Sequence, residues 1–290
     1  MTREDALIRK FNNTKTLPHV AIRLSKLLAN ENSSIKEMEE IIRLDPTLVL
    51  RVLRIANSAY YSLRQKVESI ERAVIFIGMK NLRNMVVTEA LKDIFRIEAP
   101  GQVYSRRKLW LHCAAVSICG HMIGERIFGL KGEDVFLCGI LHDIGIIVED
   151  QVAHRRFMEA CNHFHSNAKP FVDHENYHIG TNHCALGYEL SKEWNLPPAV
   201  REAVRDHHKT SPTIEPSSLT GIIQISEFIV SRMNYVAMPG MQPSLSQPLL
   251  KHVLENIKEY KTLIRDFPDE MARARELYEH EQGQGHACCN

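Results

Sequence analysis

The sequence has no apolar run of the roughly 18 residues that a membrane-spanning helix needs, and its first residues, MTREDALIRKF, are too charged for a secretory signal. It also lacks an excess of either charge, because 36 Lys and Arg face 35 Asp and Glu. A basic nucleic-acid surface is therefore not indicated. None of the seven cysteines forms a CxxC pair, a usage typical of reduced thiols. We expect a cytoplasmic protein with neither a membrane nor a nucleic acid as partner.

Strand-like alternation is weak throughout the chain, whereas helical periodicity is strong. Ser34-Ile-Lys-Glu37 has the form of a capping box, and Ser69 and Gly78 are placed to begin and end a helix. Asn57 and Ser58 end an apolar helix, where their side chains can satisfy its last backbone groups. The pattern predicts an all-α fold. The later helices are predicted over 108–128, 133–149, 151–166, 179–194, 198–208 and 218–233.

Two loop-like stretches divide the chain into three predicted parts. EAPGQ (98–102) separates a helical bundle over 1–98 from a helical core over 99–237. MPGMQPSLSQP (238–248) is rich in Pro, Gly and Ser and predicts a linker. The third part, 238–290, then comprises this linker and C-terminal helices, with a helix break expected at Pro268.

The stretch VFLCGILHDIGIIV (135–148) places an imidazole and a carboxylate inside an otherwise apolar segment. Burying an unpaired charge costs several kcal/mol or so. Of the 15 histidines, five lie within or at the end of apolar helical segments, and Asp143 accompanies them. The five are His112, His142, His183, His207 and His208.

One buried histidine is usually a hydrogen-bonded core residue, but five together with Asp143 favour a shared partner. A divalent cation would satisfy several of them, and this ligand type suits iron, manganese, zinc or nickel. On a helix, His142 would bind one ion and Asp143 would bridge two. Two ions roughly 3.5–4 Å apart would polarise a phosphoryl group and activate water. The alternative is a His–Asp hydrogen bond within ordinary helix packing.

The order of these histidines and Asp143 along the chain resembles that of the metal ligands in the HD superfamily of metal-dependent phosphohydrolases. From about Leu17 to about Val230 the chain is similar to the HDOD family of bacterial signalling proteins. The resemblance is carried by LPHVAIRL (17–24), DPTLVLRVLRIANSAYYS (45–62), SIERAVIFIGMKNLRNMV (69–86), FLCGILHDIG (136–145), TNHCALGYELSKEWNLPPAV (181–200) and AVRDHH (203–208). It implies an N-terminal bundle of about five helices packed on a helical HD-type core, followed by a C-terminal helical extension.

The related HD-GYP phosphodiesterases imply the ligands of this site position by position. They are His112, His142, Asp143, His183, His207 and His208, with Glu227 where an aspartate is expected. One or two divalent ions are implied, iron or manganese first, with zinc or nickel as alternatives.

Three departures from the HD-GYP pattern argue against hydrolysis. Ile146 stands where these enzymes have a lysine, and no GYP motif follows the HH pair. Lys108 stands where some relatives have an acidic residue one turn before the first histidine. Lys108 is therefore either a contact for an anionic ligand or a solvated side chain.

Three functions remain open from the sequence. The first is a regulatory module that binds metal, and a nucleotide-like or phosphate ligand, and acts on a signalling partner in trans. The second is a metal-dependent phosphohydrolase or phosphodiesterase for a nucleotide or cyclic dinucleotide, with Asp143 as a catalytic residue. The third is an interaction module in which the histidines are relics. The missing lysine and GYP motif favour the first, and the near-complete ligand set favours the second.

Overall fold

The computed structural model of the protein describes residues 2–13, 34–42, 46–95, 103–164, 169–194 and 196–274. Within these ranges every regular element is an α-helix, which confirms the predicted all-α class. No described helix is long and apolar enough to cross a membrane. The predicted boundary over 98–102 lies outside the described residues.

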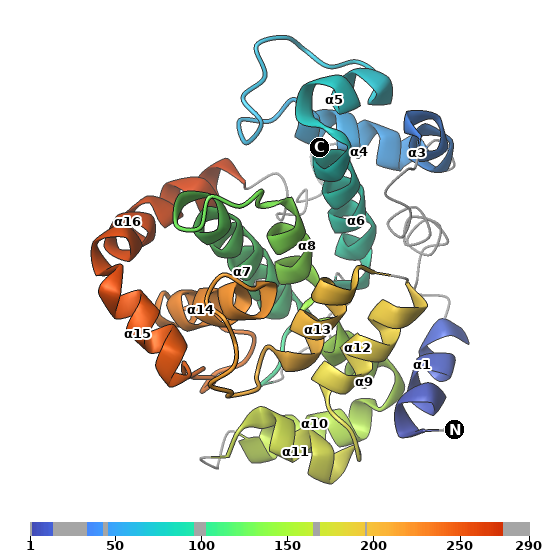
Figure 1. Cartoon of the computed structure of the whole chain (residues 1–290). Helices are drawn as coiled ribbons and strands as arrows, with labels where there is room; N and C mark the ends of the chain where they lie inside the picture. The colour runs from blue at the N-terminus through green and yellow to red at the C-terminus, as the bar shows by residue number, and fades with distance from the viewer. Residues whose placement is uncertain are drawn as a thin grey trace, which may run out of the picture.

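Four helices form one end of the molecule (Figure 1). They are α3 (Ile35–Ile42), α4 (Pro46–Ala56), α5 (Ile70–Ile77) and α6 (Met79–Phe95). The capping box of α3 is confirmed, since the Ser34 backbone N–H donates to Glu37 Oε2 over 2.8 Å and the Glu37 N–H donates to Ser34 Oγ over 3.2 Å. Ser69 Oγ caps α5, and Gly78 ends it with a φ of 84°. Helix α6 packs against α4 and α5 on one side and against α7 and α8 on the other.

Asn57 closes the loop between α4 and α5. Its Nδ2 donates to the carbonyl oxygens of Leu53 (2.7 Å) and Val67 (2.8 Å), and its Oδ1 accepts from the Val67 N–H (2.7 Å). The predicted satisfaction of a helix end is confirmed for Asn57, and the same side chain also fixes the loop.

The centre of the molecule is built from helices on either side of α7 (Arg106–Arg126). Helix α7 packs against α8 (Glu133–Leu141) and α14 (Leu219–Arg232). Helix α12 (His183–Glu193) lies between α9 (Ile144–Val152) and α13 (Pro198–Asp206), contacting both. Together they give an apolar interior around the polar residues of the site.

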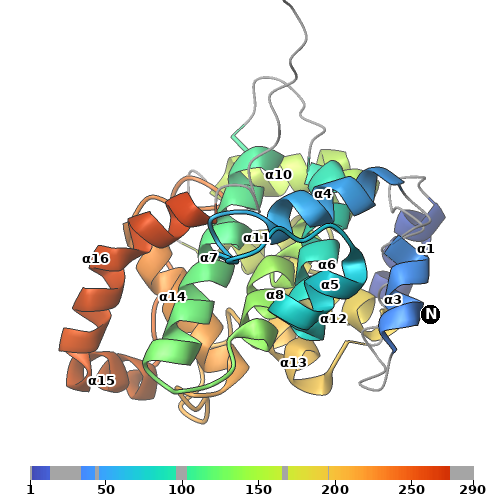
Figure 2. The same ribbon diagram turned by 90° about the horizontal axis from the view of Figure 1, so that it is seen from above.

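The remaining helices surround this core. Figure 2, seen from above, places α15 and α16 at one edge and α1 at the opposite edge. Helix α1 packs against α9 and α12, and α16 packs against α7. The bounds are α1 (Arg3–Asn13), α10 (His154–Phe164), α11 (Phe171–His178), α15 (Gln247–Glu255) and α16 (Ile257–Arg273).

The structure corrects the predicted helix break at Pro268. Helix α16 continues through Pro268 to Arg273. Proline removes one backbone donor, but Phe267 and Met271 on either side of it are buried. Their packing, which for Phe267 includes a ring contact with Tyr235, holds the helix across the proline.

Candidate metal centre

The pair His142-Asp143 lies at a junction between two helices. The predicted helix over 133–149 is wrong in this respect, because α8 ends at Leu141 and α9 begins at Ile144. His142 keeps helical angles, whereas Asp143 has φ −99° and ψ 12°. The break turns both side chains toward the same buried space, which an uninterrupted helix would not do so readily.

The ends of several helices deliver polar side chains to this space. His112 comes from the middle of α7 and Glu227 from α14, while His183 is the first residue of α12. His207 and His208 follow the last residue of α13. The structure therefore brings together all seven residues predicted as metal ligands, as two groups of possible ligand atoms that each lie within 4.8 Å of one another.

The first group contains His112, His142 and Glu227. The Nε2 atoms of His112 and His142 face each other over 3.2 Å. Glu227 Oε1 lies 3.7 Å from His112 Nε2 and 3.5 Å from His142 Nε2. Asp143 Oδ2 completes this group, 3.6 Å from His112 Nε2 and 3.4 Å from His142 Nε2.

The second group contains Asp143, His183, His207 and His208. The Nε2 atoms of His183 and His207 are 3.3 Å apart. Asp143 Oδ1 lies 3.5 Å from the first and 3.4 Å from the second. The two oxygens of one carboxylate thus face different groups of imidazoles.

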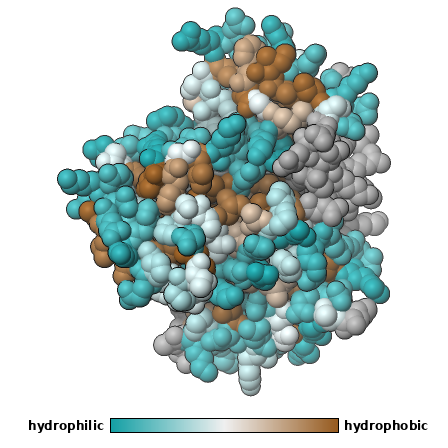
Figure 3. All heavy atoms as spheres, viewed as in Figure 1, coloured by the Kyte–Doolittle hydropathy of each residue, from teal (hydrophilic) through white to brown (hydrophobic). Residues whose placement is uncertain are grey.

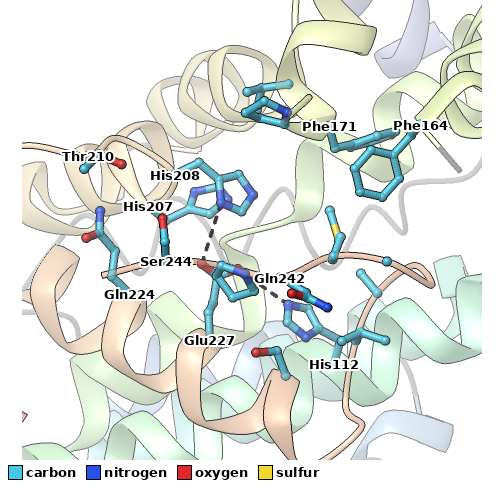
Figure 4. A pocket seen from close by; sticks show the side chains of 18 of the residues that line it. His112, Phe164, Phe171, His207, His208, Thr210, Gln224, Glu227, Gln242 and Ser244 are labelled. Atoms are coloured by element: carbon cyan, nitrogen blue, oxygen red, sulfur yellow. Dashed lines mark ion pairs between the residues drawn. The ribbon is translucent and has the colours of Figure 1, made fainter. Parts of the chain in front are cut away.

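Glu227 spans the site in a similar way. Its Oε2 lies 3.8 Å from His208 Nδ1, so Glu227 stands between His112 and His208 (Figure 4). Asp143 Oδ1 and Glu227 Oε2 are buried and have no hydrogen-bond partner among the described residues. Unpartnered buried carboxylate oxygens are costly, and a cation between the imidazoles would satisfy both.

Three imidazoles are oriented by backbone carbonyl groups. A carbonyl oxygen only accepts, so Nδ1 carries the proton and Nε2 presents its lone pair to the site. The pairs are His112 with Tyr235 (2.9 Å), His142 with Gly139 (2.7 Å) and His207 with Val204 (2.7 Å).

The buried charges of the site influence one another. Burial alone would raise the carboxyl pKa values, but the nearby imidazoles hold the pKa of Asp143 and of Glu227 well below the usual range. Burial opposes the charged form of His142, yet Asp143 and Glu227 raise its pKa to about 9. Burial and the charge of His207 lower the pKa of His208 to about 3. The site therefore attracts positive charge, which protons or a divalent cation can supply.

Two cysteines that the sequence did not single out lie beside the ligands. The possible ligand atoms of Cys113, His142 and Asp143 lie within 4.8 Å of one another. Burial, however, raises the pKa of the Cys113 thiol well above the usual range. Cys184 Sγ lies 3.5 Å from His183 Nε2. Although burial opposes it, His183 and His207 lower the pKa of Cys184 to about 7.

Glu175 orients the fourth imidazole and was also missed by sequence reasoning. Both of its carboxylate oxygens lie 2.7 Å from His183 Nδ1, and the side chain is fully buried on α11. Burial and the charge of Glu175 raise the pKa of the neighbouring Glu149 well above its usual range. Through this contact with Nδ1, Glu175 is a positioning residue for His183.

Replacing Glu175 with glutamine is expected to weaken metal binding about ten- to hundredfold, the range typical of losing such a supporting contact. The amide can still bond His183 Nδ1, but it lacks the charge that strengthens the imidazole as a ligand. Competition of each variant with a chromogenic chelator measures the affinity. Glu189→Gln, on the accessible face of α12, is the control. Equal affinities for both variants would mean that Glu175 does not support the ligand.

Gly145 explains the close approach of α9 to α12. A Cβ atom at Gly145 would lie 2.0 Å from the carbonyl oxygen of His183 and 2.7 Å from its carbonyl carbon. Only a residue without a side chain fits there. Gly145 therefore allows the start of α9, next to Asp143, to lie close to the start of α12, which carries His183.

A pocket of about 600 Å³ opens onto the candidate metal centre (Figure 4). His112, His207, His208 and Glu227 form part of its lining. Residues 236–237 and 240–244 form another wall, so the segment predicted as a linker lies against the site. The lining also includes the rings of Phe164 and Phe171 and the cations Lys169 and Lys209.

Lys108 does not line this pocket. It is exposed on the first turn of α7, where its backbone N–H donates to Ser105 Oγ. Gln224, which sequence reasoning missed, donates from Nε2 to the carbonyl oxygens of Asp206 and Lys209, each over 3.0 Å. It fixes the turn that carries His207 and His208.

The family model of the HDOD domain matches residues 15–210, and the chain belongs to the HDOD family.

Solved structures share this fold. An HDOD domain protein of unknown function from Geobacter sulfurreducens superposes with a TM-score of 0.73 at 23% identity, covering 95% of this chain and 98% of that one. A Shewanella amazonensis protein whose name suggests a phosphohydrolase gives a TM-score of 0.69 at 22% identity, covering 94% and 96%.

Two curated proteins are similar in sequence. An uncharacterized protein of Treponema pallidum is 22% identical over 209 residues, 69% of this chain and 38% of its own length. The uncharacterized Bacillus subtilis protein YuxH is 32% identical over 69 residues, 24% of this chain and 17% of its own length. The chain thus spans well under half the length of either relative.

Proposed function

We propose that this protein is an HDOD signalling module whose core binds two divalent cations. His112, His142, Glu227 and Asp143 Oδ2 would hold one ion, and His183, His207, His208 and Asp143 Oδ1 the other. The observation that carries the proposal is the division of the Asp143 oxygens between two groups of imidazoles. Iron or manganese suits these nitrogen and oxygen donors first, with zinc and nickel as alternatives.

The pocket beside the metal centre supports a phosphate-bearing ligand of nucleotide size. Its volume of about 600 Å³ lies within the range of small-molecule sites. Lys169 and Lys209 would face the phosphate groups, and Phe164 and Phe171 offer apolar surface to a base or sugar. These lysines are better placed for this role than Lys108, which lies outside the pocket.

Hydrolysis of that ligand is the second candidate function. It is favoured by one observation, namely that residues of both ligand groups, His112 and His207, line the same pocket. Bound cations would supply Lewis-acid activation of a phosphate group and of water. Asp143 would orient both ions, and Lys209 would balance charge on the phosphate. The lysine found after HDIG in the related phosphodiesterases is absent, and Ile146 is fully buried instead.

The proposal is tested by the metal content of the full chain purified without chelator, together with turnover of phosphodiesters. We expect close to two ions per chain, because two complete ligand groups are present. With metal bound, we expect a nucleotide to bind without turnover across a panel of cyclic and linear nucleotides.

Fewer than about 0.2 ions per chain would instead support the view that the histidines are relics. Turnover with manganese or iron that Asp143→Ala abolishes would make the phosphodiesterase the main function.

We also propose that the helices preceding the core contact a signalling partner in trans, within a three-part division at residues 98 and 238. Apolar side chains gather over α3–α5 on the face seen in Figure 3. Leu50 and Ile75 are 70% and 69% exposed, and Phe76 is 44% exposed. Apolar side chains that gather on the surface in this way are typical of protein interaction sites.

A further inference from the structure

A second pocket, of about 470 Å³, lies at the surface between α1 and the junction of α9 with α10. Five of its lining residues are basic, namely Arg3, Lys10, His154, Arg155 and Arg156. The others are Ala6, Leu7, Val152 and Ala153, so none of the described residues that line it is acidic. All five basic side chains are accessible to solvent.

Two of these cations are held in place by neutral groups. Arg3 Nε donates to the carbonyl oxygen of Ile179 over 3.2 Å, and Lys10 Nζ donates to that of Val152 over 2.6 Å. A carbonyl oxygen fixes the position of a cation without cancelling its charge. Lys10 thereby joins α1 to the last turn of α9.

Among the lining residues, His154 pairs with a carboxylate. Asp150 is buried, and its two oxygens contact Arg106 Nε (2.5 Å) and His154 Nδ1 (2.8 Å). Within the described part of the chain, no carboxylate forms an ion pair with Arg3, Lys10, Arg155 or Arg156. Four permanent cations from two helices thus share one hollow without a counter-charge.

We infer that this pocket is a binding site for a small oligophosphate anion. Four permanent cations match a ligand with about three to four negative charges, which is more than one phosphate group carries. The volume suits a small molecule. The first N–H groups of α10, at His154–Arg156, add weaker attraction to the same side.

This site is separate from the candidate metal centre. Helix α9 begins beside Asp143 and ends at Val152, and nine residues of helix span about 14 Å. An oligophosphate held by Arg155 and Arg156 would therefore not touch the imidazoles. The two sites stand at opposite ends of one helix.

Calorimetric titration of the full chain with inorganic tripolyphosphate tests the inference. We expect saturable binding that weakens as salt is added. The double variant Arg155→Gln/Arg156→Gln should lose about tenfold or more in affinity for each arginine removed. Lys10→Gln, which alters α1 instead of α10, should weaken binding in the same direction. Both changes are at exposed positions, and thermal unfolding checks that the variants remain folded.

The control is Lys258→Gln/Lys261→Gln, which removes two exposed cations of α16, at the edge of the molecule opposite α1. Its affinity for tripolyphosphate should stay within about twofold of the unmodified chain. The inference is overturned if tripolyphosphate does not bind, or if only the control variant loses binding. It is equally overturned if phosphatidylglycerol vesicles bind through Arg155 and Arg156 while tripolyphosphate does not. The Arg155→Gln/Arg156→Gln and Lys10→Gln variants differ from the unmodified chain only at this pocket, so a loss of binding in them is independent of the metal centre and of the test of the proposed function.

Discussion

Replacing Asp143 with asparagine is expected to remove most of the bound metal from both halves of the site. Each carboxylate oxygen faces a different pair of imidazoles, at 3.4–3.6 Å. The amide keeps one oxygen and loses the negative charge, so the affinity should fall by more than about 100-fold, beyond the loss of a supporting contact. Elemental analysis of the purified variant measures the remaining ions.

Thermal unfolding gives a second measure of the same change. An ion that binds only the folded chain stabilises it by about 2.7 kcal/mol at 100 times its dissociation constant. The Asp143→Asn variant should lose this stabilisation, and a chelator should lower the melting temperature of the unmodified chain but not of the variant. Asp173→Asn, an exposed change on α11, is the matched control. Full metal content in Asp143→Asn would contradict the bridging role.

Replacing Gly145 with alanine is expected to destabilise the fold by about 3 kcal/mol or more, the upper range for overpacking a core. The added Cβ would meet the backbone of His183 at 2.0–2.8 Å, and backbone atoms cannot rotate away. Helix α12 must therefore shift, carrying His183 with it. Urea unfolding measures the loss, and the metal content should fall together with it.

Gly124→Ala provides the comparison within another buried helix. A Cβ there would lie 3.3 Å from Val135 Cγ2, the movable end of a side chain. The helix-forming preference of alanine over glycine, about 1 kcal/mol, offsets this contact, so the net change should stay within about 1 kcal/mol. Similar losses at both positions would show that Gly145 has no special role.

Periodicity and residue chemistry predicted different parts of this molecule with different success. Helix positions followed from apolar spacing, and polar groups in apolar segments pointed to the residues that converge. The break at Asp143 had no such signal, because the apolar run continues on both sides of it. Helix α11, FVDHENYH, was missed because its apolar residues are too few to show helical spacing. Glu175 was missed with it.

The role of residues 236–244 was equally hidden from the sequence. Pro, Gly and Ser are common in linkers, and nothing local shows that this stretch lines a pocket beside residues 112 and 207. Pocket walls arise from contacts distant in sequence, whereas composition is a local property.

The carbonyl group of Tyr235 that orients His112, like Glu227 itself, lies beyond residue 210, where the match to the HDOD domain family model ends. A fragment that ends at residue 210 would keep every histidine of the candidate metal centre. It would lack the Glu227 carboxylate and the Tyr235 carbonyl group that orients His112. The proposed metal centre therefore extends beyond the residues that the family model matches. Expression designs and domain grafts should extend at least through the pocket wall that ends at residue 244.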